Sequence, residues 1–370
     1  YNTYMKFIAE KSQIVDSLQN AAAVAERRQT IPILANLRLK IVEGKLEVTA
    51  TDLEIQIKTY SDLIEIQEEG ETTVSARKMS ELCRSLPEGE NVSFSLSNGK
   101  LTVSSSNFHA DFATISSDDF PEIEISEEQV PVSLESSVLK RILSKTSFSM
   151  ASQDVRYYLN GMLLEINGNK INGVATDGHR LAYSSAATGN SEADMKNILP
   201  RKAVLELAKL LSADEDKINL LIGPSYVVIR TENLSFSSKL IDGKYPDYDK
   251  VFPTGEPLPL EISKEVLQSA LSRASVLSNE KYRGVRFQLS ENKLKLTANN
   301  PEQESAEEEL DVVYQGSELE VGFNIGYLLD VLNSIETEKV KFEFYGEDSS
   351  CIIKESNSED DVYVIMPMRL

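Results

Sequence analysis

The sequence predicts an α+β fold in which three similar domains follow one another, each with helices backed by antiparallel sheets. The first observation is a hairpin-like unit that occurs three times, with turns at Gly44, Gly168 and Asn292 that are separated by equal steps of 124 residues. The second is a helix-and-strand pattern that recurs in the same order in each third of the 370 residues. A period this long indicates repeated domains rather than a short-period solenoid. We expect domains at residues 5–125, 126–253 and 254–370.

Each third begins with a helical pattern, in which apolar residues share one helix face, as Ile14, Leu18 and Ala22 do in the first third. Serine before such a pattern is a favoured N-cap, and the predicted caps are Ser12, Ser136 or Ser137, and Ser263. A second helix is predicted near residues 77–86, 201–211 and 324–335. Segments that alternate apolar and polar residues follow the helices, which is typical of half-buried antiparallel strands. Every domain is therefore expected to run helix, strands, helix, strands.

Polar residues close the repeated hairpin units. Asp52 and Asp177 close the first two units, and Asn300 closes the third. Because Asp and Asn both bond their own backbone in turns, an Asx-type turn is the favoured interpretation. A metal-binding or acid–base carboxylate pair is the alternative, but His109 and His179 have no cysteine or histidine at ligand spacing. No phosphate-binding loop or nucleophile motif is present, so we expect no catalytic residues, no metal and no cofactor.

The net charge of −21 argues at first against binding to nucleic acid, which is itself polyanionic. The cations are nevertheless concentrated on predicted helices, whereas the acids crowd loops and linkers. These cations are Arg77, Lys78, Arg84, Lys140, Arg141, Lys145, Arg201, Lys202 and Lys209. Helices that carry them could line one common surface and contact phosphates without reading bases. Solvated helix faces are the alternative.

Three further segments each allow a structural and a binding interpretation. The pair His179-Arg180 is either a packed turn or part of a binding site. The acidic run 304–309 is either a solvated face or a docking surface for basic residues. The apolar segment 364–370 contains methionines, whose flexible side chains adapt to different ligands. It is predicted either to pack as an edge strand or to form a plastic groove for peptides.

The sequence also bears on the compartment. It contains no run of eighteen apolar residues, so no transmembrane helix is expected. Cys83 and Cys351 lie far apart and fit a reducing compartment better than a disulfide scaffold. We therefore expect a cytoplasmic protein with no membrane partner.

Across residues 5–370 the chain closely resembles the bacterial sliding clamps, the β subunits of DNA polymerase III. The most specific segments are residues 153–161, 175–182, 199–202, 277–286, 297–303 and 363–370. The resemblance implies a head-to-tail homodimeric ring whose helices line the hole and whose sheets lie outside. It also implies a non-catalytic processivity factor in DNA replication that encircles duplex DNA without sequence specificity. Polymerases, the clamp loader and repair proteins would bind it through short apolar peptide motifs.

The resemblance assigns residues to DNA and to peptides. DNA contacts carry over to Arg28, Gln153, Tyr157 and Tyr158, to which we add the helix cations Arg201 and Lys202. A peptide-binding pocket carries over to Arg156, Leu159, Thr176, Gly178, His179, Arg180, Leu181, Pro246, Val251, Ser350, Val364, Ile365, Met366, Pro367 and Met368. Lys250 joins this pocket where some members have arginine, which puts bidentate contact there in question.

The same resemblance places the dimer interface at Phe112, Val276, Leu277, Glu304, Glu307 and Glu308. Asn107 and His109 stand where some members carry cations opposite the acids, so the interface is expected to depend more on its apolar patch. Because topology holds a closed ring on DNA, weak phosphate contacts inside and an acidic outside are compatible with the net charge. Two other interpretations remain open: a metal-dependent hydrolase that uses Asp52 and Asp177, and a scaffold ring unrelated to DNA.

Overall fold

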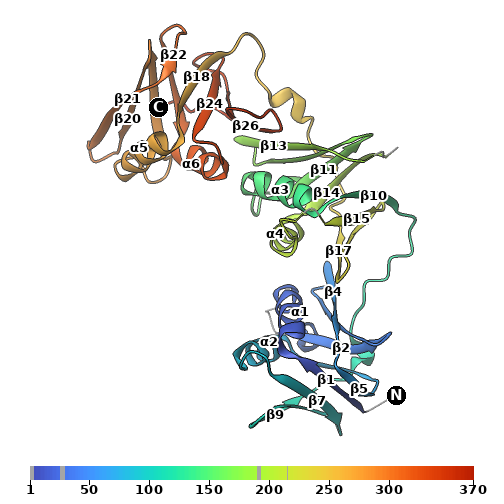
Figure 1. Ribbon diagram of the computed structural model, residues 1–370. Coiled ribbons are helices and arrows are strands. Elements are labelled where there is room, and N and C mark those ends of the chain that lie inside the picture. The colour runs from blue at the N-terminus through green and yellow to red at the C-terminus, as the bar shows by residue number, and fades with distance from the viewer. Residues whose placement is uncertain (1–3, 26–29, 190–192, 215) are drawn as a thin grey trace. The chain divides into compact units, whose positions relative to one another are not determined.

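The computed structural model describes residues 4–25, 30–189, 193–214 and 216–370, and the chain forms two compact units (Figure 1). The first unit comprises Tyr1–Ser137 and Lys209–Leu240, and the second comprises Val138–Ala208 and Ile241–Leu370. Each unit contains two sheets in which neighbouring strands run antiparallel. Short 3-10 helices connect the larger elements: η1 (Pro32–Ala35), η2 (Ser117–Asp119), η3 (Ser147–Ser149), η4 (Tyr157–Asn160) and η5 (Tyr248–Val251).

The first unit holds a five-stranded and an eight-stranded sheet. In spatial order the smaller sheet consists of β5 (Glu65–Glu68), β1 (Met5–Glu10), β7 (Asn91–Ser97), β8 (Lys100–Ser105) and β9 (Phe108–Ala113). The larger sheet consists of β10 (Val130–Glu135), β15 (Lys217–Ile222), β16 (Tyr226–Arg230), β17 (Leu234–Lys239), β4 (Ile55–Asp62), β3 (Lys45–Thr51), β2 (Asn36–Val42) and β6 (Glu71–Ser75). Helices α1 (Lys11–Val24) and α2 (Ala76–Ser85) pack together, and α1 buries Ile14 and Leu18 on the face that the sequence predicted.

The second unit holds a nine-stranded and a four-stranded sheet. The larger sheet consists of β14 (Asp194–Pro200), β11 (Gly161–Asn167), β12 (Lys170–Thr176), β13 (Arg180–Ala187), β26 (Asp361–Ile365), β25 (Cys351–Glu355), β24 (Lys339–Phe344), β18 (Leu258–Ser263) and β22 (Val313–Tyr314). The smaller sheet consists of β21 (Ser305–Asp311), β20 (Lys293–Asn299), β19 (Gly284–Ser290) and β23 (Leu319–Asn324). The remaining helices are α3 (Ser136–Thr146), α4 (Arg201–Leu210), α5 (Lys264–Val276) and α6 (Ile325–Ser334). Among the described residues, no helix is long and apolar enough to span a bilayer.

The three predicted hairpins are present as β2–β3, β11–β12 and β19–β20. Their turn residues Gly44, Gly168 and Asn292 all have positive φ, at 78°, 57° and 55°. Glycine reaches this left-handed region without steric cost, and asparagine reaches it more easily than most residues. The equal steps in the sequence therefore mark the same turn in three equivalent hairpins.

Strands from different thirds of the sequence are joined edge to edge. We call the pairing of β4 with β17 the first joint, and it places Ile57 opposite Phe236. The pairing of β13 with β26 is the second joint, and it places Ala182 opposite Tyr363. The first joint lies within the first unit and the second joint lies within the second unit. Each joint therefore merges strands of two thirds into one continuous sheet.

A third repeated feature follows the last strand of each third, where the chain returns to an edge strand. The N–H of Ile115 donates to the carbonyl of Thr73 at 3.2 Å, and Ile241 does the same to Ile198 at 2.9 Å. Met368 repeats this contact with Gly322 at 2.7 Å. The segment 366–370 is thus held by a backbone contact that the repeat uses three times.

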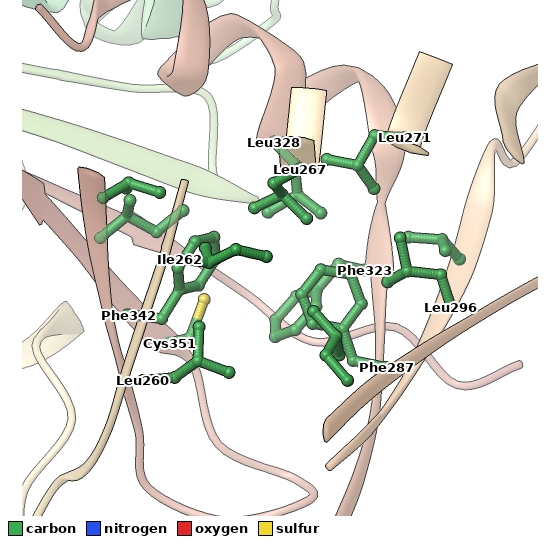
Figure 2. Close-up of a cluster of buried hydrophobic side chains, with 14 of the residues drawn as sticks. Leu260, Ile262, Leu267, Leu271, Phe287, Leu296, Phe323, Leu328, Phe342 and Cys351 are labelled. Carbon is green, nitrogen blue, oxygen red and sulfur yellow. The ribbon is translucent and has the colours of Figure 1, made fainter. Parts of the chain in front are cut away.

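Figure 2 shows the apolar core of the last third of the chain. Phe287 meets Phe323 edge-on with ring centroids 5.3 Å apart, and Leu267 of α5 and Leu328 of α6 belong to the same cluster. Cys351 is buried among them, and burial raises the pKa of its thiol. Because each fully buried large apolar side chain contributes about 1.5–3 kcal/mol, clusters of this kind supply most of the folding free energy.

One of the predicted N-caps is confirmed and the others are wrong. The side chain of Ser263 accepts from the N–H of Val266 at 3.4 Å and caps α5. Ser12 lies inside α1, which begins at Lys11, so it cannot precede the helix. Ser136 opens α3 rather than preceding it, and its hydroxyl donates to the carbonyl of Ser212 at 3.1 Å; Ser137 lies inside the same helix. Contacts with distant residues decide these ends, and the local sequence does not show them.

Candidate functional site

The turn between β12 and β13 is built by Asp177. Its carboxylate oxygen Oδ1 accepts from the N–H groups of His179 and Arg180 at 2.9 and 3.1 Å. Gly178 has φ of 90°, a conformation that glycine adopts without strain. The equivalent Asp52 accepts from the N–H groups two and three residues on at 3.0 and 2.8 Å. The Asx-turn interpretation is therefore confirmed for both aspartates.

The carboxylate-pair alternative has little support in this geometry. Asp52 and Asp177 belong to different units, and each carboxylate is engaged by its own turn. Asn300 makes a related turn, accepting from the N–H of Glu304 at 2.9 Å, although it cannot act as an acid or a base. Within the described ranges, no group of three His, Cys, Asp or Glu residues is placed to hold a metal ion.

Arg180 forms a packed polar centre beside this turn. Its guanidinium contacts Asp177 at 3.2 Å and Asp330 of α6 at 2.5 Å, and it donates to the carbonyl of Phe148 at 2.8 Å. It also lies over the ring of Tyr327, 4.5 Å from the centroid. The side chain is 11% exposed, so the packed-turn interpretation holds for Arg180. It fastens the turn to α6 and does not present its charge to solvent.

His179 differs from its neighbour because it is exposed. Its carbonyl accepts from the N–H of Met366 at 3.1 Å, which fixes the chain where it leaves β26. Met366, Pro367 and Met368 are half-buried, whereas Val364 and Ile365 before them are buried in the sheet. The edge-strand interpretation of the segment is therefore wrong, because β26 lies inside the sheet and pairs with β13 on one side and β25 on the other. The half-buried residues still leave apolar surface beside His179.

An apolar cluster lies beneath this surface. It contains the predicted pocket residues Leu159, Leu181 and Val364, with Val251 packed against it. Tyr245 and Tyr248 belong to the same cluster, and the sequence analysis did not assign them to the site. They flank the exposed Pro246, and this aromatic spacing around a proline could have indicated them. Thr176 is the last residue of β12, and Ser350 directly precedes β25.

The loop that carries Pro246, Lys250 and Val251 is anchored by a polar network around the buried Glu165. The hydroxyl of Tyr248 donates to the carboxylate of Glu165 at 2.7 Å, and Lys196 contacts the same carboxylate at 2.9 Å. Burial by itself would raise the pKa of Glu165, but the hydrogen bonds from Lys196 and Tyr248 lower it. Burial, together with Glu165, raises the pKa of Tyr248. This network holds η5 against the sheet.

The cavity next to Pro246 measures about 520 Å³. Pro246 is the predicted groove residue that lines it, together with Lys196, Tyr245 and Tyr248. Lys250 itself is exposed and pairs with Asp247 at 3.2 Å. We call the peptide-binding site that the resemblance assigns to these loops and the segment 366–368 the groove. Its predicted members, several of which are buried beneath the surface, are Arg156, Leu159, Thr176, Gly178, His179, Arg180, Leu181, Pro246, Lys250, Val251, Ser350, Val364, Ile365, Met366, Pro367 and Met368.

Arg156 connects the turn between β12 and β13 to the loop that precedes η4. Its guanidinium pairs with Asp154 at 2.8 Å, donates to the carbonyl of Asp177 at 3.3 Å and lies against Gly178. The side-chain hydrogen bond from Arg156 lowers the pKa of Asp154 to about 2. A Cβ at Gly178 would stand 2.9 Å from the guanidinium, so glycine makes room for this contact. Arg156 therefore supports the groove from its edge.

The same loop displays the predicted DNA-contacting residues. Gln153 has φ of 56°, and the side chain of Tyr157 is 55% exposed. Tyr158 is half-buried and meets Tyr157 edge-on at 5.6 Å between ring centroids. Val155, between Gln153 and Tyr157, is 96% exposed, which the sequence did not indicate. Arg28 lies outside the described residues.

The helix cations fall into two groups. Lys202, Arg77, Lys78, Arg84 and Lys209 are exposed. Arg201 points its guanidinium toward the carbonyls of Met150 and Ala151, both at 3.4 Å.

The cations of α3 are engaged within the chain. Lys140 donates to the carbonyl of Ala208 at 2.9 Å, and Arg141 pairs with Asp361 at 2.8 Å. Lys145 is buried and donates to the carbonyl of Ser334. The interpretation of α3 as part of an exposed cationic surface is therefore wrong.

The predicted dimer residues lie on or next to the open edge strands β9 and β21 and at the end of α5. Phe112 is half-buried in β9, and Val276 at the end of α5 is 77% exposed beside the half-buried Leu277. Glu308 of β21 makes two hydrogen bonds with Arg273 at 2.6 and 3.0 Å. Glu307 pairs with Lys295 at 2.9 Å, and Glu304 accepts from the amide of Asn300 at 2.6 Å. These acids thus already have ion pairs or hydrogen bonds inside the chain.

Comparison with known proteins decides the family. Three family models match in order along the chain: the N-terminal, central and C-terminal domains of the DNA polymerase III beta subunit, at residues 5–124, 133–247 and 249–369. The chain belongs to this family. The beta sliding clamps of Pseudomonas aeruginosa and Escherichia coli are 44% and 43% identical to it, over 99% of this chain and all of theirs.

Solved structures of the family share its fold. The sliding clamp of Pseudomonas aeruginosa bound to griselimycin has a TM-score of 0.96 at 44% identity, covering 99% of this chain and 100% of that one. The beta subunit of Thermotoga maritima reaches 0.93 at 27% identity over the same shares. The α+β clamp fold, with three similar domains of helices and antiparallel sheets, is therefore confirmed.

Proposed function

We propose that this chain is a DNA sliding clamp, which encircles duplex DNA as a closed homodimeric ring and tethers the replicative polymerase. The observation that carries the proposal is the match of all three domains, in order and at full length, to the beta sliding clamps. We place the domains at residues 5–125, 126–253 and 254–370. The ring performs no catalysis of its own, uses no cofactor and acts in the cytoplasm. Clamp loader and repair proteins bind the groove through short apolar motifs.

The internal repeat supports ring closure. In each third, one strand follows the repeated hairpin and pairs with its second strand; these strands are β4, β13 and β21. In each third, the last strand of the closing sheet segment also occupies an equivalent place; these strands are β9, β17 and β26. β4 pairs with β17 and β13 pairs with β26, whereas β9 and β21 are the outermost strands of their sheets. A third joint between β9 and β21 of a second copy would complete the series. Two such head-to-tail joints close a ring of two chains.

The two joints also predict the register of the third. Ser238 faces Ile55 in the first joint, and Ile365 faces Arg180 in the second. The equivalent residues place Phe112 opposite Glu304 of the partner subunit and His109 opposite Glu307 of the partner subunit. Since Glu304 and Glu307 already have contacts within their own chain, Phe112 against Val276 and Leu277 supplies the main attraction.

DNA contacts are proposed for Arg28, Gln153, Tyr157, Tyr158 and Lys202, and for the exposed cations Arg77 and Lys78 of α2. The exposed ring and hydroxyl of Tyr157, and the exposed ammonium of Lys202, suit phosphates and sugars more than base edges. Such contacts are independent of sequence and weaken with salt, as a ring that slides requires. We expect Arg201 to support the preceding loop through the carbonyls of Met150 and Ala151.

Retention on DNA tests the proposal directly. The labelled protein is loaded onto nicked circular DNA with a clamp loader, and its release is compared before and after the circle is cut once. A topological clamp stays on the circle at high salt and leaves the linear DNA within minutes, because only the linear form has ends. Equal release from both forms would contradict the ring, and failure to load at all would favour a scaffold unrelated to DNA.

A further inference from the structure

We propose that Leu370, Gly322 and Gly284 form an anchor that positions Met366 and Met368 in the groove, so that they act as positioning residues for peptide binding. This inference rests on the groove proposed above. It specifies what holds Met366 and Met368, which we call the methionine wall of the groove. The anchor lies away from the groove's own apolar cluster, and none of its three residues belongs to the predicted pocket. Its parts are a cradle of two glycines, one apolar side chain and two hydrogen bonds.

The two glycines leave room for the side chain of Leu370. A Cβ at Gly284 would stand 2.3 Å from the Cδ2 atom of Leu370, and a Cβ at Gly322 would stand 2.8 Å from its Cδ1 atom. Both distances are far below an ordinary van der Waals contact. Neither glycine has positive φ, so the backbone could accept other residues at both positions. At Gly284 the nearest atoms all belong to Leu370, whereas at Gly322 the backbone oxygen of Met368, at 2.6 Å, is nearer still. Glycine at these two positions therefore lets the side chain of Leu370, which is 54% exposed, and the backbone of Met368 lie against the sheet.

Hydrogen bonds hold the same segment on both sides of Arg369. The N–H of Met368 donates to the carbonyl of Gly322 at 2.7 Å, and Arg286 donates from Nη2 to the carbonyl of Leu370 at 3.2 Å. Arg286 is itself oriented by Glu320 at 3.1 Å. Since Gly322 also lies opposite Arg286 in the pairing of β19 with β23, all of these contacts meet on one sheet edge.

The cradle is a special feature of the third repeat. The equivalents of Gly322 in the other two thirds are Thr73 and Ile198, which make the same backbone contact with Ile115 and Ile241. Both carry a Cβ at the position that Leu370 needs empty in the third repeat. All three repeats thus share the backbone hydrogen bond. Only the third repeat has a glycine there, which leaves space for a large side chain next to that bond.

The anchor and the turn at His179 hold the methionine wall from its two ends. Met366 donates to the carbonyl of His179 at 3.1 Å, and Met368 donates to Gly322, with Pro367 between them. A side chain that is already ordered in the free protein loses little further conformational entropy when a peptide binds. If Leu370 no longer filled the cradle, Met366 and Met368 would have to be ordered by the peptide, and we expect its dissociation constant to rise about fivefold.

The test uses the full chain and a labelled peptide with one leucine and one phenylalanine anchor. Leu370→Ala removes the anchoring side chain and Gly284→Ala fills the part of the cradle that only Leu370 occupies, so each should raise the dissociation constant about fivefold. Leu370→Met keeps an apolar side chain of similar volume and should restore affinity to within twofold. Arg369→Ala is the matched control, because that exposed neighbour does not enter the cradle.

A second measurement separates positioning from general stability. Carbon-13 labelled methionine methyl groups report the order of Met366 directly, without any peptide. In Leu370→Ala the Met366 signal should sharpen and move toward the value for an unfolded chain, while the thermal midpoint and the dimer stay unchanged. An unaltered affinity in Leu370→Ala would overturn the anchor alone. An absence of peptide binding by the unchanged chain would overturn the groove, and the anchor's role with it.

Discussion

The first and second joints share one backbone arrangement but differ in the side chains around it. In the first joint the N–H of Lys239 donates to the carbonyl of Glu54 at 2.9 Å, and in the second Met366 does the same to His179 at 3.1 Å. At the first joint Gln56 accepts from the N–H of Ile123 at 2.9 Å and fastens the following linker. Its equivalent at the second joint is the apolar Leu181, which is buried in the cluster under the groove.

The polar surroundings of the first joint continue in Arg38 and Lys58. Both contact Glu122, and Arg38 also lies over the ring of Phe120 at 5.4 Å from the centroid. The first joint is therefore bordered by ion pairs, whereas the second joint ends at the half-buried Met366.

The largest effect is expected at the third joint, between two chains. Val276→Asp with Leu277→Asp would place two carboxylates in the apolar patch that meets Phe112, and burying a charge without a counterion costs several kcal/mol. We expect the dimer dissociation constant to rise at least a thousandfold. Analytical ultracentrifugation at micromolar concentration should show monomers, with Val266→Asp on the opposite part of α5 as the control. A dimer that survives the double change would show that the third joint lies elsewhere.

Removal of residues 366–370 should give the next largest effect. It deletes the methionine wall of the second joint and leaves the edge strands β9 and β21 unchanged. Each apolar side chain of the peptide that is no longer buried loses up to about 1.5–3 kcal/mol of binding free energy. The affinity should therefore fall at least tenfold. Fluorescence polarisation measures the affinity, and ultracentrifugation confirms that the dimer is retained. An unchanged affinity would place the groove elsewhere.

At the first joint the expected effect is a dependence of the stability of the fold on pH, through Glu122. Burial by itself would raise the pKa of Glu122, but the hydrogen bonds from Lys58 and Arg38 outweigh it and lower the pKa to about 2. A carboxylate with a lowered pKa stabilises the fold above its ordinary value of 4.5, and this contribution is lost as the pH falls toward 2.

Glu122→Gln tests this contribution. Because its side chain is one-third exposed, solvent screening limits the expected loss at neutral pH to about 1 kcal/mol. Thermal unfolding between pH 2 and 7 should show the difference from the unchanged chain narrowing below pH 4.5. The exposed neighbour Glu124→Gln is the matched control and should leave the midpoint unchanged. A constant difference across this range would show that the ion pair does not link the first joint to pH.

The repeat was predictable from the sequence because its signals are local. The turns at Gly44, Gly168 and Asn292 depend on residues that tolerate positive φ, and the helices depend on periodic apolar residues. The engaged state of the α3 cations was not predictable, because their acceptors are distant in sequence. Arg141 and its acceptor Asp361 are 220 residues apart.

The site shows the same division between local and distant contacts. The Asx turn at Asp177 follows from residues within the turn itself. The burial of Arg180 depends on Asp330, which lies 150 residues further along the chain. The groove residues were assigned by resemblance, and the aromatic residues around Pro246 could have indicated Tyr245 and Tyr248, but not what holds them in the apolar cluster. Their positions depend on a loop that folds back onto β11 and β12 through Glu165.

The smallest expected effect extends the comparison to the second helices of the two thirds. Arg77 and Lys78 of α2 are both exposed, whereas the equivalent Arg201 of α4 turns to backbone carbonyls and Lys202 is exposed. Each phosphate contact that is lost lowers the slope of log affinity against log salt by about one. Lys202→Ala should therefore lower the slope by about one and Arg77→Ala with Lys78→Ala by about two. Arg201→Ala should leave the slope unchanged and lower the thermal midpoint instead, since it removes the donor to Met150 and Ala151.

Binding to short duplexes of two unrelated sequences at several salt concentrations measures these slopes. If Arg201→Ala changed the slope as much as Lys202→Ala, the guanidinium would leave its carbonyls for DNA, and the difference between α2 and α4 would not persist in the complex.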